Sequence, residues 1–92
     1  MPRGLPPLTP GEIVLILLAR AFSFSRSTAS SHDIYTGTWN HQKRIVVVDM
    51  GITIYNDADM IKLVIRQSGM SREEFYGATP KTAKKIGLQV KK

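Results

Sequence analysis

His32 is the residue of this chain best suited to acid–base chemistry, and it stands in the polar stretch Ser30-Ser31-His32-Asp33. Histidine gains and loses a proton near neutral pH, so it can act as a general base or a general acid. The Ser/Thr-rich segment 27–31 before it predicts a turn, which would deliver the histidine to the start of a strand. The alternative interpretation is a surface histidine that donates one hydrogen bond and has no further role.

Three cationic side chains are expected near the same strand ends. A histidine that acts as a base on a phosphate ester also needs cations or amides that stabilise the charge developing on phosphorus. Arg26 ends the first predicted strand, while Lys43 and Arg44 enter the third across a hairpin, so at least one of this pair should share a face with His32. Arginine can bind phosphate through two parallel hydrogen bonds, and lysine offers a point charge. We predict phosphate contacts for all three, with ordinary solvated strand ends as the alternative.

The orientation of His32 follows from strand alternation. Asp33 is its neighbour and should point to the opposite face, as an exposed carboxylate and not as a partner of the histidine. Ile34 has the same parity as His32 and is expected to face the helices. A regular strand would then turn the histidine inward unless it lies at the rim of the sheet.

His41 and Trp39 lie in the predicted hairpin loop, 38–42. Together they could stack on a nucleobase or supply a general acid. The interpretation we favour is a plain loop histidine and a tryptophan that caps the sheet.

Composition limits the function further. The chain has 92 residues, 42% of them hydrophobic, which fits one small domain with a modest core. It has no cysteine and two histidines, so we expect no disulfide, thiol nucleophile, metal site or small-molecule cofactor.

The net charge of +6 is concentrated at the C-terminus, where residues 80–92 contain no acid and carry the lysines Lys81, Lys84, Lys85, Lys91 and Lys92. We predict that this basic tail, Lys81, Lys84 and Lys85 in particular, binds RNA through counterion release. A solubilising end without RNA contact is the alternative.

The apolar run from Ile13 to Ala19 is too short to span a bilayer. Glu12 directly before it and four prolines ahead of it disfavour the alternative of a secretory signal. We therefore expect a helix in a cytoplasmic protein without membrane association.

Capping signals mark the predicted helices. Thr9 and Glu12 form a Thr-x-x-Glu capping box before the first helix, whose wide apolar face suggests cover on more than one side. Asn56 or Asp57 caps the second helix, and Gly69 ends it. A second capping box, Ser71-Arg72-Glu73-Glu74, opens a short third helix that ends near Gly77.

Between the helices, alternation and β-branched runs predict strands over 23–26, 31–36 and 43–49. The continuous Ile45-Val46-Val47-Val48 run favours a central strand for the last of them. The order predicts an α+β two-layer sandwich, α-β-β-β-α with a short extra C-terminal helix. The folded domain should cover residues 9–79, after a flexible N-terminus 1–8 and before the basic tail 80–92.

Two motifs resemble the HicA family, also called YcfA-like proteins, and the resemblance covers roughly residues 9–76. Ser31-His32 matches the family's Gly-Ser-His signature, and its Gln-x-Gly-x-Ser-x-x-x-Phe motif is matched by Gln67, Gly69, Ser71 and Phe75. The resemblance implies a fold like that of double-stranded-RNA-binding domains. It also implies the toxin of a type II toxin–antitoxin pair, a ribonuclease that cleaves mRNA and is neutralised by a HicB antitoxin. The family's catalytic histidine falls on His32, with Ser31 beside it as an RNA contact.

The chain departs from the family pattern at several positions. Ser30 replaces the signature glycine, Ala21 the glycine usual before a phenylalanine, and Asp49-Met50 stand where a proline and a histidine are common. Serine can replace glycine at position 30 if φ stays negative there. These departures keep two alternatives open: a non-catalytic RNA-binding module, or an inactive partner that only binds the antitoxin.

Overall fold

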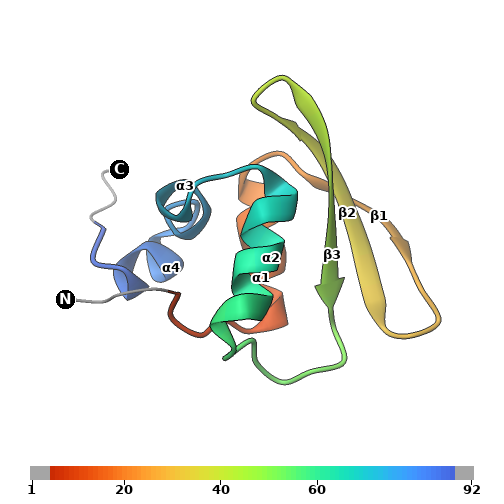
Figure 1. Ribbon diagram of the computed structural model, residues 1–92, viewed down its shortest axis with the longest axis horizontal. Helices are drawn as coiled ribbons and strands as arrows, with labels where there is room; N and C mark the ends of the chain where they lie inside the picture. Colours follow the sequence, from red (N-terminus) through yellow and green to blue (C-terminus); the bar gives the residue numbers. More distant parts are fainter. Residues whose placement is uncertain (1–4, 89–92) are drawn as a thin grey trace.

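The computed structural model describes residues 5–88, an α+β fold whose first six elements follow the predicted order; a seventh, α4, was not predicted. The elements are α1 (Pro10–Ala19), β1 (Ser23–Ser27), β2 (His32–Trp39), β3 (Gln42–Asp49), α2 (Ala58–Ser68), α3 (Arg72–Tyr76) and α4 (Pro80–Lys85). The three strands form an antiparallel sheet in the order β1-β2-β3. Helices α1 and α2 lie beside the sheet, and α3 and α4 lie on their far side (Figure 1).

Helix α1 begins as predicted, because Thr9 and Glu12 bond each other's main-chain N–H groups at 3.1 and 2.9 Å. Ile13, Ile16 and Leu17 are buried. Leu15 and Leu18 are 58% and 49% exposed, so within the chain α1 is covered on one side, and the predicted cover on a second side is not supplied by the chain itself. Within residues 5–88, no helix combines the length and apolar character needed to cross a membrane.

The hairpin of β2 and β3 turns at Asn40 and His41, both with positive φ. Such two-residue turns match the twist of the paired strands. Residues 38, 39 and 42 of the predicted 38–42 loop therefore belong to the strands, and the connection is limited to Asn40 and His41. Tyr35 is buried and pairs with buried Val46, which places the odd-numbered residues of β2 toward the helices. The prediction that Ile34 faces the helices is therefore wrong, and His32 points to the open face of the sheet.

Strand β3 lies at the edge of the sheet and β2 in the centre, so the predicted central place of β3 is wrong. Side chains cover part of its free edge. Gln67 Oε1 accepts a hydrogen bond from Val47 N–H at 3.0 Å, and Tyr55 Oη accepts one from Asp49 N–H at 2.6 Å. Because these amides are bonded, the edge tolerates an apolar β-branched sequence.

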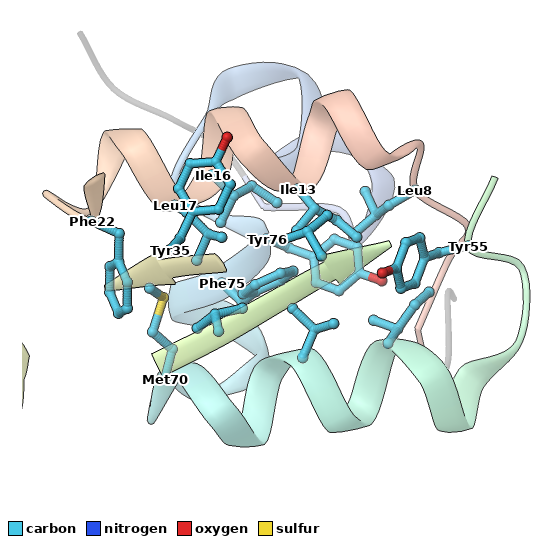
Figure 2. Close-up of a cluster of buried hydrophobic side chains, with 14 of the residues drawn as sticks. Leu8, Ile13, Ile16, Leu17, Phe22, Tyr35, Tyr55, Met70, Phe75 and Tyr76 are labelled. Atoms are coloured by element: carbon cyan, nitrogen blue, oxygen red, sulfur yellow. The ribbon is translucent and has the colours of Figure 1, made fainter. Parts of the chain in front are cut away.

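The hydrophobic core lies between α1 and α2, with Phe75 and Tyr76 of α3 in its middle (Figure 2). The segment before α1 packs on it. Leu8 is fully buried, and the Tyr76 hydroxyl donates a hydrogen bond to the Pro6 carbonyl at 2.7 Å. The predicted flexible N-terminus is therefore wrong for residues 5–8; residues 1–4 lie outside the described residues.

The folded unit also continues past its predicted end at residue 79. Helix α4 buries Thr82 and Ala83, and the Thr82 hydroxyl donates to the Tyr76 carbonyl at 2.6 Å. Ile86 is 8% exposed. The predicted tail is therefore part of the packed structure as far as residue 88, while Lys91 and Lys92 lie outside the described residues.

Candidate active site

The turn before β2 fixes the orientation of the His32 ring. The His32 main chain bonds Thr28 through two contacts, N–H to Thr28 Oγ1 at 3.3 Å and carbonyl from Thr28 N–H at 2.8 Å. His32 Nδ1 lies 3.0 Å from the Ser30 carbonyl oxygen. The Ser30 hydroxyl oxygen lies 3.1 Å from the same Nδ1. A protonated Nδ1 donates to the carbonyl and a bare Nδ1 accepts from the hydroxyl, so this turn holds the ring in either neutral tautomer. In the tautomer with its hydrogen on Nδ1, Nε2 has the lone pair that a base needs.

Asp49 is the carboxylate partner of this base. It pairs directly with His32 across the strands, and its Oδ2 lies 3.8 Å from His32 Nε2. The two side chains are 39% and 25% exposed, so both are open to a ligand. The carboxylate attracts the positive charge that the ring gains with a proton. Asp33 behaves as predicted: strand alternation places it on the other face, where it accepts a hydrogen bond from Ser27 Oγ at 2.7 Å.

A groove of about 380 Å³ opens beside this pair, between β3 and α2. Its lining consists of His32, Val47, Asp49, Tyr55, Met60, Leu63, Val64 and Gln67. A concave, mainly apolar surface with a few converging polar groups is the usual form of a small-ligand site. Burial raises the pKa of the Tyr55 phenol; the hydrogen bond from the Asp49 amide lowers it, and the Asp49 charge raises it.

Arg26 is the cation that the sheet brings closest to His32. An irregularity in pairing between Phe24 and Arg26 shifts the register, so that Arg26 pairs with Ile34 on the open face. An extra residue in one strand is a β-bulge, and it reverses the face of the residues after it. Arg26 is thus a diagonal cross-strand neighbour of His32, with Cβ atoms roughly 7–8 Å apart.

Lys43 and Arg44 do not join this group. Lys43 shares the open face but pairs with Thr38, six residues along β2 from His32, which is about 20 Å. Arg44 points to the helix side, where its Nε donates to the Trp39 carbonyl at 3.2 Å and its guanidinium lies against Gly69. Neither Lys43 nor Arg44 is therefore placed to contact a phosphate that is bound beside His32, contrary to the prediction.

The C-terminal lysines are also far from His32. Lys81, Lys84 and Lys85 belong to α4, on the side of the helices away from the sheet (Figure 1). Lys81 and Lys85 lie 3.6 and 3.9 Å from the Glu12 carboxylate. Any RNA contact they make is separate from the groove.

Ser31, Trp39 and His41 have distinct places. Ser31 is exposed directly before His32 with φ of +65°, and Ser30 has no positive φ, so serine fits the backbone at position 30. Trp39 is half-buried on the helix side, with the Arg20 guanidinium 5.7 Å from its ring centre. His41 is exposed at the opposite end of the hairpin from His32. The sheet therefore does not bring Trp39 and His41 to the base.

The sequence reasoning missed two residues, Asp49 as the partner of His32 and Tyr55 as a groove residue. A two-residue turn at Asn40–His41 fixes every cross-strand pair, including His32 opposite Asp49, so the turn length was the available signal. Tyr55 lies in a loop without periodicity and gave none. No cluster of three or more His, Cys, Asp or Glu suited to a metal ion occurs in residues 5–88.

Comparison of the chain with protein-family models, with curated proteins and with solved structures finds no match. The family expected from the Ser31-His32 and Gln67–Phe75 motifs therefore stays a prediction.

Proposed function

We propose that this protein is an endoribonuclease of the HicA type that cleaves mRNA without a metal ion, with His32 as the general base. One observation carries the proposal: a half-exposed histidine, oriented through Nδ1 by Ser30, stands on an open sheet face, next to Asp49 and in the lining of a groove. The net charge of +6 suits a polyanionic substrate. Cleavage of mRNA implies a cytoplasmic location.

In the proposed reaction, His32 Nε2 takes the proton of a ribose 2′-hydroxyl. The 2′-oxygen then bonds to the adjacent phosphorus, the bond from phosphorus to the 5′-oxygen breaks, and the departing 5′-oxygen takes up a proton. The products are a 2′,3′-cyclic phosphate and a 5′-hydroxyl. Asp49 stabilises the imidazolium, and Arg26 offers a charged, two-pronged contact for a phosphate oxygen.

We further propose that a HicB-like antitoxin neutralises the protein by covering the groove. Met60 and Leu63 on its α2 wall are 36% and 52% exposed, as expected for apolar side chains that a partner covers. Co-expression with the product of a neighbouring reading frame, followed by pull-down, tests this. Leu63→Glu should weaken capture, and equal capture of the variant would count against the groove as the contact.

The test of the function compares an RNA with the DNA of the same sequence, and with the RNA carrying a single 2′-deoxynucleotide at the cleaved position. The proposal predicts that only the RNA without the 2′-deoxynucleotide is cleaved, and that the product ends in a 2′,3′-cyclic phosphate. EDTA should not prevent this cleavage. Cleavage of the DNA, or loss of RNA cleavage in EDTA, would overturn the mechanism. A folded protein that never cleaves RNA would favour the non-catalytic RNA-binding alternative.

A further inference from the structure

The hydroxyl group of Tyr55 has a hydrogen that the fold does not use. Leu8 and Tyr55 hold each other through two main-chain hydrogen bonds of 3.0 and 2.6 Å, and Tyr55 is 3% exposed. Its Oη accepts the Asp49 amide N–H at 2.6 Å. A phenol can accept and donate at once, and among residues 5–88 no acceptor takes the hydrogen of this one.

Tyr55 and His32 border the same groove and both contact Asp49. His32 approaches the carboxylate of Asp49, whereas Tyr55 bonds the main-chain amide of the same residue. Asp49 therefore lies between the imidazole of His32 and the unused hydroxyl donor of Tyr55. Cleavage of a phosphodiester needs this combination, a base for the attacking oxygen and an acid for the leaving oxygen.

We propose, resting on the function proposed above, that Tyr55 is a second catalytic residue and gives its proton to the departing 5′-oxygen. The 2′-oxygen bonds to phosphorus as its proton passes to His32 Nε2. The phosphorus–5′-oxygen bond breaks, and the leaving oxygen takes the Tyr55 proton. The proton held by His32 then restores the phenol through water, so that the enzyme returns to its starting state.

Burial raises the pKa of the Tyr55 phenol, so the group keeps its proton at neutral pH and is a weaker acid than a free tyrosine. A 5′-alkoxide is far more basic than a phenolate, so transfer to the leaving oxygen is downhill.

Two substrates distinguish a Tyr55 that acts as a general acid from a Tyr55 that has only a structural role. An RNA dinucleotide has a poor leaving group that needs a proton, and uridine 3′-(4-nitrophenyl phosphate) has a leaving group that needs none. Tyr55→Phe should slow cleavage of the dinucleotide by about 10²-fold and that of the nitrophenyl ester by less than about threefold. His32→Gln should slow both. Tyr35→Phe, at another buried tyrosine outside the groove, should slow neither.

An equal loss on both substrates would show that Tyr55 only positions Asp49, and no loss on either would show that the hydroxyl is unused; both results overturn the inference while leaving His32 in place. A wild type that cleaves neither substrate overturns the function itself. If circular dichroism shows that Tyr55→Phe is unfolded, 3-fluorotyrosine placed at position 55 keeps the hydrogen bond from the Asp49 amide and makes the phenol more acidic. It should then change the rate for the dinucleotide alone, and an equal change for the ester would contradict the proposal.

Discussion

Replacing Ala21 with glycine should stabilise the protein, because Ala21 occupies a backbone conformation that favours glycine. Its φ is +68°, directly after the end of α1. The Phe22 N–H bonds the Leu17 carbonyl at 2.9 Å and the Ala21 N–H bonds that of Leu18 at 3.1 Å. This is the hydrogen-bond pattern of a Schellman motif, whose left-handed position is usually glycine.

The size of the effect follows from two opposing terms. The left-handed conformation costs an L-residue with a Cβ roughly 1–2 kcal/mol, which glycine avoids. Glycine loses more backbone entropy on folding, by roughly 0.5–1 kcal/mol. The net gain is about 0.5–1 kcal/mol, and for a domain of this size it raises Tm by about 2–8 °C.

Ala19→Gly is the matched control. Ala19 is also exposed, but it lies in the last turn of α1 with a helical φ, so glycine there should cost about 1 kcal/mol. Urea unfolding followed by circular dichroism at 222 nm measures both variants against wild type. If Ala21→Gly is destabilised to the same degree as Ala19→Gly, the assigned strain at position 21 is wrong.

Three further predictions concern the sheet and the core. Arg26→Gln should lower kcat/KM for RNA by about 10-fold or more, since it removes a charge-assisted phosphate contact near His32, while Lys43→Gln should change it by less than about threefold; equal losses in steady-state assays would contradict the different distances. Gly37→Ala should cost about 1–3 kcal/mol in urea unfolding, because a Cβ there would lie 2.7 Å from the Phe22 ring, and an unchanged midpoint would refute this contact. Glu12→Gln should cost about 0.5–1 kcal/mol at low salt and less at 1 M NaCl, because it removes the charge paired with the lysines of α4 but keeps the capping geometry; a loss that does not depend on salt would point to the cap instead.

The sequence was sufficient for the order of elements from α1 to α3 because local signals mark them. Thr9 with Glu12 and Ser71 with Glu74 form the predicted capping boxes, and Gly69 ends α2 in the left-handed conformation. Such signals depend on neighbours in the chain, so they can be read without tertiary structure.

Which side chains of β2 point to the helices could not be predicted, because the neighbours Ile34 and Tyr35 are both apolar. Only the packing against α1 and α2 determines that Tyr35 is the buried one. The bulge that moves Arg26 to the open face, and the turn length that sets Asp49 opposite His32, are likewise properties of strand pairing. In α4 the lysines hid the buried positions Thr82 and Ala83, because a short helix with a polar surface resembles a solvated tail.

The central claim is that His32 is the base of a ribonuclease, and the most direct measurement compares the same substitution at the two histidines. His32 and His41 lie at opposite ends of the β2–β3 hairpin. The rate of cleavage of a defined RNA should fall by about 10²–10⁴-fold in His32→Gln, because glutamine cannot exchange a proton at neutral pH, with RNA binding retained. It should stay within about threefold of wild type in His41→Gln. Equal rates for wild type and a folded His32→Gln protein, or an equal loss in both variants, would contradict the assignment.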